Sequence, residues 1–325
     1  MNINLVLQGI FSALFIASVL RISTALVLPA LGGLITDLAG SINIALEGTM
    51  LVSAFTGVIV SGFSRNVWLG VLAGIVSGVA FSALLAYFHL YLGTNIILAG
   101  TALNILASGG TVFLLFMLTG DKGSSSTLAS GVVPTVNIPF IQDIPFLGTV
   151  LSGHNVFVYG AFLLTFLINK LLYNTKFGVH LRAVGEDPLA ATSVGINVRR
   201  TKFLTILLSG FLASLGGLNL SMAYLSSFQR DMTAGRGFIA LAAVYLGGRK
   251  PWGTVLAAIL FGIADALSNQ LGTLKIPSQL VQMIPYVITV LALVVNGIRN
   301  RTRLIEQTKR FQERELVRAN SEKPK

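Results

Sequence analysis

The sequence predicts an all-α protein, a polytopic helical bundle that spans a membrane. Two observations carry this prediction. Of the 325 residues, 54% are hydrophobic and only 11% are charged, whereas soluble domains carry about 25% charged residues. The mean hydropathy is +0.79, so the charged groups are too few to cover a surface exposed to water. The apolar excess therefore has to face lipid, which excludes disordered chains, fibres, disulfide scaffolds and ordinary cytosolic enzymes.

The long apolar runs give the predicted spans in order. A helix needs about 20 largely apolar residues to cross the hydrocarbon core, and about ten segments serve as crossings, some of them poorly formed. The first run is interpreted as a membrane helix and not as a cleaved signal peptide, because no Lys or Arg precedes Arg21 and further spans follow at once. The predicted spans are 4–20, 22–40, 43–63, 67–90, 94–119, 153–173, 203–225, 236–248, 252–270 and 280–298. Residues 1–298 are thus expected to form a transmembrane domain, followed by a basic tail over 299–325.

The positive charge is a signal of topology. The net charge is +11, and nine of the 23 basic residues lie in the tail. With the spans above, 17 basic residues fall on one side of the membrane and six on the other. Lys and Arg are retained on the cytoplasmic side. We therefore expect a multi-pass protein of the cell membrane with both termini in the cytoplasm, and no binding of nucleic acid.

Two predicted spans are interrupted. Residues 236–248 give only a short helix, closed by two glycines. The stretch 28–50 contains Pro29, Gly32, Gly33 and Gly40 and restarts at Ser41. Short or broken segments indicate a central substrate site, because irregular backbone at membrane depth survives only inside protein or beside a water-filled cavity. Irregular packing without a ligand is the alternative. Elsewhere, Gly70, Gly74 and Gly78 recur every four residues and predict close helix contact.

The external connection 120–152 has two parts. Residues 123–126 are polar and suggest a flexible segment, whereas 132–147 alternates apolar residues with three prolines. A loop of this length without a clear helix is often functional. A docking site for an external partner and a plain lid on the membrane surface both fit this pattern.

The segment 176–202 contains a complete short helix. Asp187 can cap its first turn, Pro188 suits the first helical position, and Gly195 can end it in the left-handed conformation. Basic residues flank it on both sides. Such order exceeds what a plain connector needs. It predicts either an element on which another protein docks, or an interfacial helix that merely lies on lipid.

The residues of this helix also carry a family resemblance. The run Gly-Glu-Asp-Pro-Leu-Ala-Ala-x-x-x-Gly-Ile over 185–196 resembles the cytoplasmic coupling loop of ABC transporter permeases of the branched-chain amino acid, ribose and nucleoside class. The segments 41–48 (SINIALEG) and 233–243 (TAGRGFIALAA) are similar to two further motifs of its nucleoside and simple-sugar branch. The resemblance covers about residues 30 to 298. It is strongest to the smaller of two paired permeases in nucleoside importers fed by a basic-membrane-protein lipoprotein.

The resemblance implies an importer and not an enzyme, in which the permease pairs with a sister permease and with ATP-binding subunits, and receives its substrate from an extracellular substrate-binding lipoprotein. No phosphate-binding loop G-x-x-x-x-G-K-[ST] occurs in this sequence, so ATP and Mg²⁺ are expected on a partner subunit and no cofactor on this chain. A simple-sugar permease is the alternative substrate class. Closure of the ATP-binding pair is expected to push on the helix and to open the path. The contacts with the ATP-binding subunit would map onto Glu186, Asp187, Pro188, Ala190, Ala191 and Gly195.

Polar residues at membrane depth are the candidates for the substrate path, since such groups are costly and tend to be functional or paired. Asn43 and Glu47 stand four apart and would share a helix face; an amide and a carboxylate suit the hydroxyls of a ribose. The alternative for each polar residue is that it braces a broken helix and does not contact the substrate. Arg236 suits the mouth of the path or a topology anchor. The candidates for the path are Asn43, Glu47, Asn104, Arg236 and Asp265.

Other classes of function find little support. Three scattered histidines and the absence of cysteine give no expected metal site and no catalytic residues. A secondary transporter driven by an ion gradient would need several intramembrane ionisable groups, and Glu47 and Asp265 are nearly the whole supply. An intramembrane enzyme would need clustered catalytic groups.

Overall fold

The computed structural model describes residues 12–128, 130–139 and 146–272, and near the C-terminus residues 283, 286–291, 293–294 and 297–298. Within this part of the chain, seven helices are long and apolar enough to cross a membrane, which confirms the predicted all-α membrane bundle. The total of about ten crossings stays a prediction. The basic tail and eight of the 19 residues of the predicted span 280–298 lie outside the described residues. The seven helices are α2 (Ala13–Leu38), α3 (Leu46–Ser64), α4 (Val67–Leu90), α5 (Ile96–Thr119), α7 (Val156–Asn174), α10 (Val198–Leu218), continued by the π-helix η1 (Asn219–Tyr224), and α12 (Pro251–Leu271).

Within the described residues, the predicted spans 4–20 and 22–40 are joined in one helix. α2 runs without interruption from Ala13 to Leu38, through Arg21, Pro29 and both glycines. The two glycines, Gly32 and Gly33, lie in α2 at helix contacts and do not break it: a Cβ at Gly32 would come within 2.8 Å of the Ser209 carbonyl oxygen on α10. The interruption falls after α2, over residues 39–45, between Leu38 and the start of α3.

The glycines of α4 confirm the predicted close packing. A Cβ at Gly70 would meet the Gly57 carbonyl oxygen of α3 at 2.5 Å, and one at Gly78 would meet the Ser214 hydroxyl of α10 at 2.0 Å. α4 therefore lies against both α3 and α10 with almost no side chain between them. Its boundaries also match the prediction, because Asn66 caps the first turn by accepting the backbone N–H of Trp68 at 2.9 Å.

The chain after η1 turns back into the bundle. α11 (Arg236–Leu246) has 11 residues, which gives a length of about 16 Å, too short to cross a membrane. It starts inside the bundle, contacts α2, α3 and α12, and ends near Asp37 in the last turn of α2. The predicted short helix over 236–248 is therefore confirmed as a half-length helix.

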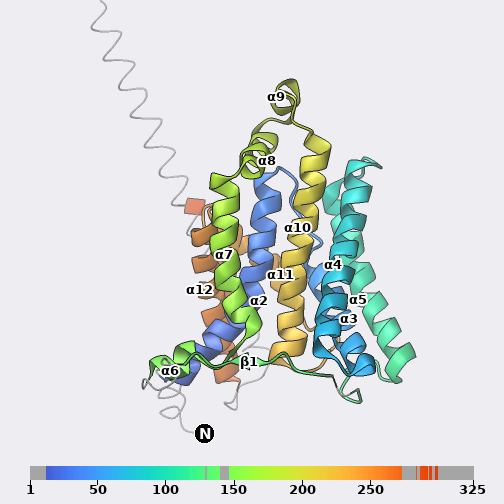
Figure 1. The fold of residues 1–325 in the computed structure, drawn as a ribbon, viewed down its shortest axis with the longest axis vertical. Coiled ribbons are helices and arrows are strands. Elements are labelled where there is room, and N and C mark those ends of the chain that lie inside the picture. The colour runs from blue at the N-terminus through green and yellow to red at the C-terminus, as the bar shows by residue number, and fades with distance from the viewer. Residues whose placement is uncertain are drawn as a thin grey trace, which may run out of the picture.

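The loop that was expected to be external is attached to the bundle. Ser124 bridges to Gln229, and buried Ser125 exchanges hydrogen bonds with the backbone of Phe228. The expected flexibility of 123–126 is therefore wrong, because these residues pair with the segment after η1. Further along, β1 (Thr135–Val136) pairs antiparallel with β2 (His154–Asn155) beside the short helix α6 (Leu147–Leu151), and this layer runs across one end of the bundle (Figure 1).

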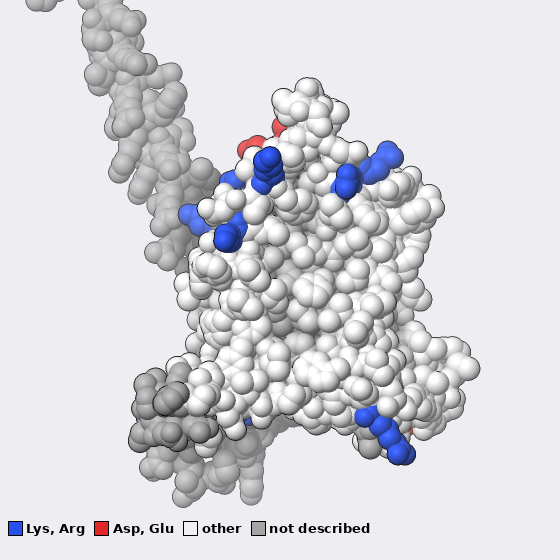
Figure 2. All heavy atoms as spheres, in the orientation of Figure 1, with Lys and Arg blue, Asp and Glu red and all other residues white. Residues whose placement is uncertain are grey.

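The opposite end of the bundle carries α8 (Lys176–Glu186) and α9 (Pro188–Ser193). Figure 2 shows Lys and Arg gathered around this end, a smaller group at the other end, and an uncharged band between them. Because α2 is a single helix, its first residues lie at the end opposite α9. The predicted cytoplasmic side of the N-terminus assumed two spans before residue 40, whereas residues 13–38 form one helix; the side on which the N-terminus lies stays a prediction.

Candidate functional site

The short helix α9 has the capping that the sequence predicts. The Asp187 carboxylate accepts the backbone N–H groups of Leu189 at 2.8 Å and Ala190 at 3.1 Å. Pro188 occupies the first turn, and Gly195 has a φ of +85°. These contacts confirm the local structure of the helix. The sequence did not reveal that α8, capped by Thr175, leads into it as an ordered helix.

The tip of α9 is apolar and exposed. Leu189 is 81% exposed and Val194 is 76% exposed, while Ala191 packs inward at 3%. Of the residues predicted to contact an ATP-binding subunit, Glu186, Asp187, Pro188, Ala190 and Gly195 are all exposed. Leu189 and Val194 thus place two large apolar side chains at the exposed tip of α9.

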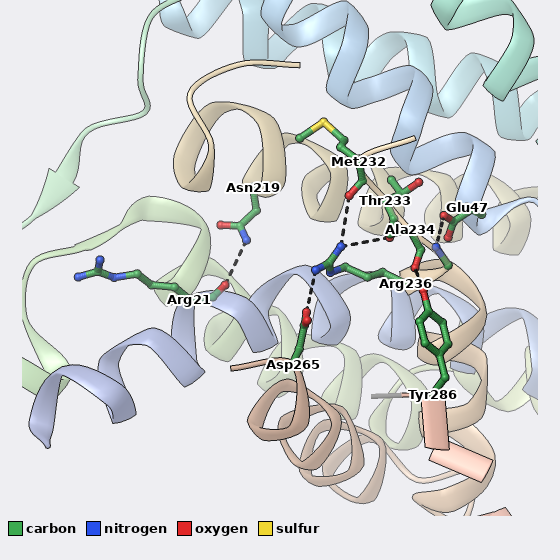
Figure 3. A network of polar contacts seen from close by, with 10 residues as sticks. Arg21, Glu47, Asn219, Met232, Thr233, Ala234, Arg236, Asp265 and Tyr286 are labelled. Atoms are coloured by element: carbon green, nitrogen blue, oxygen red, sulfur yellow. Dashed lines mark hydrogen bonds and ion pairs between the residues drawn. The ribbon is translucent and has the colours of Figure 1, made fainter. Parts of the chain in front are cut away.

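A second site lies at the N-terminal end of α11. The carboxylate of Glu47 accepts the backbone N–H of Gly235 at 2.7 Å and that of Gly237 at 2.6 Å (Figure 3). The first N–H groups of a helix have no partner within it, and the helix dipole favours negative charge there. Glu47 thus acts as the cap of α11, although 188 residues separate it from Gly235.

Arg236 and Asp265 form an ion pair beside this cap. The Arg236 Nη2 to Asp265 Oδ2 distance is 2.7 Å, and the side chains are only 19% and 16% exposed. Arg236 also donates to the carbonyl oxygens of Met232 and Thr233. Its Nε atom is buried without a hydrogen-bond partner among the described residues. Arg236 therefore lies inside the bundle in an ion pair, and not at an exposed end where a topology anchor would lie.

The ion pair lines a cavity of about 270 Å³. A second cavity of about 330 Å³ lies toward the first turns of α2 and shares Asn269 with it. Asp265, Ser268 and Asn269 follow one another at i, i+3 and i+4 on α12, a spacing that could have identified them together from the sequence. The first cavity is lined by Leu26, Ala234, Arg236, Ile239, Phe261, Asp265, Ser268, Asn269 and Tyr286.

The two asparagines face the backbone of the chain and do not line either cavity. Asn43 is fully buried, donates to the Ser209 hydroxyl at 3.0 Å and accepts the N–H of Ala45. Asn104 accepts the N–H of Gly48 at 2.8 Å and donates to the Ile44 carbonyl. Asn43 precedes α3, so the expectation that it shares a helix face with Glu47 is wrong. Both amides hold residues 43–48 in place, and a role in the path stays a prediction.

Comparisons of the sequence with known proteins agree on one family. The family model described as "Branched-chain amino acid transport system / permease component" matches residues 15–293. The nucleoside ABC transporter permease protein NupC of Lactococcus lactis is 36% identical over 87% of this chain and 92% of its own. The guanosine ABC transporter permease protein NupQ of Bacillus subtilis is 33% identical over 86% and 91%. Among solved structures, PsaBC from Streptococcus pneumoniae in complex with Fab is similar in fold, with a TM-score of 0.50 and 18% identity over 91% of this chain and 95% of that chain.

Proposed function

This chain belongs to the family of branched-chain amino acid transport system permease components, and we propose that it is the transmembrane permease subunit of an ATP-driven importer of nucleosides. The observation that carries the proposal is the similarity to two nucleoside or guanosine permeases over almost their whole length. The chain supplies the membrane passage, and the free energy comes from ATP hydrolysed elsewhere.

Three kinds of partner follow from this function. An ATP-binding subunit, which holds ATP and Mg²⁺, docks on the exposed tip of α9. A sister permease pairs with this chain in the membrane; in support, only 22% of the residues in the apolar 18-residue stretch of α5 are buried within this chain. An extracellular substrate-binding lipoprotein delivers the nucleoside to the end of the bundle opposite α9.

The orientation follows from the docking surface. α9 lies in the cytoplasm, where the Lys and Arg residues gather, and the tail 299–325 is cytoplasmic as the sequence predicts. Ser12 then lies at the external end of α2.

The two adjoining cavities are the proposed path within this subunit. The second cavity, at the first turns of α2, leads to Asn269 and from there to Arg236 and Asp265 in the first cavity. The ion pair has zero net charge, and it offers both donors and acceptors to an uncharged, polyhydroxylated substrate. Alternating access would expose these residues to one side of the membrane at a time.

Purification tests the proposal. We would isolate the tagged chain from its native membrane in mild detergent and identify the proteins that accompany it by mass spectrometry. We expect an ATP-binding subunit, a second permease and a lipoprotein. Recovery of the chain alone, together with uptake that persists when the ATP-binding gene is deleted, would support a gradient-driven carrier and overturn the proposal. Uptake of labelled nucleosides against labelled ribose then decides between the two substrate classes.

Gly195 tests the role of α9. No atom lies within 4 Å of a Cβ placed there, but its φ of +85° strains a β-branched residue. Gly195→Val should therefore reduce uptake relative to ATP hydrolysis, whereas Gly195→Asn, which tolerates this conformation, should retain coupling. Normal transport by Gly195→Val would contradict a coupling role.

A further inference from the structure

A cluster of three side chains at the cytoplasmic end of α2 joins α2 to the end of α11. We define it as the Asp37 cluster: Asp37, Tyr245 and Arg249. Asp37 lies in the last turn of α2 and is 6% exposed. Its carboxylate accepts hydrogen bonds from the Tyr245 hydroxyl at 3.1 Å and from Arg249 Nε, and its carbonyl oxygen accepts Arg249 Nη2 at 3.1 Å. All three donors come from the last residues of α11 or the turn that follows it.

The turn is built to hold Arg249 in this position. Gly248 and Arg249 both have positive φ, of +67° and +58°, and the Arg249 N–H donates back to Val244 at 3.0 Å. A non-glycine residue in the left-handed region is uncommon and persists where its surroundings require it. Here the ion pair with Asp37 is the contact that the strained residue makes.

The residues after Asp37 touch the segment that leads into α9. A Cβ at Gly185, near the end of α8, would come within 2.0 Å of the Leu38 carbonyl oxygen, and Gly40 faces the Gly185 backbone. Lys202 of α10 donates to the Gly40 carbonyl at 3.5 Å. Backbone therefore packs directly on backbone, so α8 cannot move toward residues 38–40 without displacing them.

The opposite end of α11 lies at the proposed path. Arg236 there pairs with Asp265 at the cavity, and Glu47 caps the helix. α11 is about 16 Å long, so one rigid helix joins the Asp37 cluster to the cavity. Both of its ends are held by carboxylates from the first 50 residues of the chain, Asp37 and Glu47.

We propose that the Asp37 cluster transmits displacement of α8 and α9 to α11, and that Asp37 is a positioning residue for transport. The proposal rests on the proposed function, because it requires an ATP-binding subunit that moves α9. Asp37 touches no substrate in this scheme. It fixes the cytoplasmic end of α11 so that motion of residues 38–40 shifts the helix and the Arg236–Asp265 pair with it.

The test uses the complete transporter in proteoliposomes and measures two rates, ATP hydrolysis and nucleoside uptake. Asp37→Asn retains the side-chain shape and removes the charge. We expect ATP hydrolysis close to wild type and a roughly tenfold loss of uptake per ATP, within the usual range of coupling between sites. Arg249→Gln should have a similar effect. The double variant should lose no more uptake per ATP than either single variant, because both substitutions remove the same Asp37–Arg249 interaction.

Asp231→Asn is the matched control. Asp231 is also ion-paired, with Arg230, but its side chain is 49% exposed, and we expect uptake per ATP to be unchanged. A purely structural role for Asp37 would lower ATP hydrolysis, assembly and uptake together. Tyr245→Phe, which removes one hydroxyl, provides a milder variant that should assemble and lose part of the uptake per ATP.

Three outcomes would overturn the proposal. The first is wild-type uptake per ATP in both Asp37→Asn and Arg249→Gln. The second is failure of Asp37→Asn to assemble while Arg249→Gln and Tyr245→Phe remain fully coupled. The third is a wild-type protein with no ATP-driven uptake, which would overturn the proposed function as well; the first two leave that function intact.

Discussion

The Glu47 carboxylate accepts the backbone N–H of Gly237 at 2.6 Å and thereby joins the start of α3 to the start of α11. A helix that begins inside a membrane bundle exposes N–H groups where no bulk water can satisfy them. The cap comes from a residue 190 positions away in the sequence. The start of α11 is therefore capped by a single long-range carboxylate.

Glu47→Gln tests this dependence. The amide has one acceptor oxygen and no charge, so it cannot satisfy both N–H groups and loses the favourable interaction with the helix dipole. We expect the free energy of unfolding to fall by about 1–3 kcal/mol, measured as the thermal midpoint in detergent. Glu186→Gln, at an exposed position on α8, is the control. Equal midpoints for the two variants would show that the cap does not stabilise the protein.

Gly237→Ala should be destabilising for a steric reason. A Cβ at this position would lie 2.5 Å from the Glu47 nitrogen and 2.7 Å from its Cα. These are backbone atoms that cannot rotate away, so the two helices must separate, and overpacking of this kind costs about 1–3 kcal/mol. Gly110→Ala on α5, where nothing lies within 4 Å, should be neutral or stabilising in the same thermal assay. A loss at Gly110 as large as that at Gly237 would contradict the steric argument.

Local structure was predicted well where the determinants are local. The bounds of α4 and the capping of α9 follow from Asn66, Asp187 and Gly195, which lie within a few residues of the turns that they control. α2 was divided wrongly because Arg21 suggested a boundary. In the structure the Arg21 Nε donates to His154 at 3.4 Å, a contact between distant segments that lets a cation remain on a membrane helix.

The sequence identified individual residues of the candidate site but not the contacts between them. Arg236 and Asp265 were selected as costly polar residues, but no pattern in the sequence indicates that they pair with each other. Asp37 was not selected, although a carboxylate at the end of an apolar run gives the same signal as Asp265. Its partner Arg249 lies 212 residues away. Pairings of this range depend on the packing of α11 against α2, which periodicity does not encode.

His154 predicts a dependence of stability on pH. It is 1% exposed, and its pKa is lowered from 6.5, first by burial and then by the nearby Arg21, while the Val150 carbonyl opposes this shift. In the unfolded chain the imidazole takes up a proton as the pH falls below about 6.5, but in the folded protein it does so only at lower pH. The unfolded state binds more protons in this window, so stability falls as the pH decreases.

Thermal unfolding between pH 8 and pH 5 measures this effect. The free energy of unfolding should be constant above the ordinary pKa and should decline below it by at most about 1.4 kcal/mol per pH unit. His154→Gln should flatten the decline, whereas His180→Gln, at an exposed position, should not. An unchanged pH profile in His154→Gln would assign the decline to other groups.

The Arg236–Asp265 pair predicts an asymmetry between single and double variants. Removal of one partner leaves the other charge buried at the cavity, which costs about 3–5 kcal/mol for a buried pair. Arg236→Gln and Asp265→Asn should each lower the thermal midpoint strongly. The double variant has no uncompensated charge and should recover part of the loss. Uptake should remain low in all three, because the proposed path needs the donors of Arg236. A double variant that unfolds at the sum of the two single losses would show that the charges do not interact. Recovery of both stability and uptake in the double variant would show that the pair only holds α11 against α12 and is not needed for the substrate path.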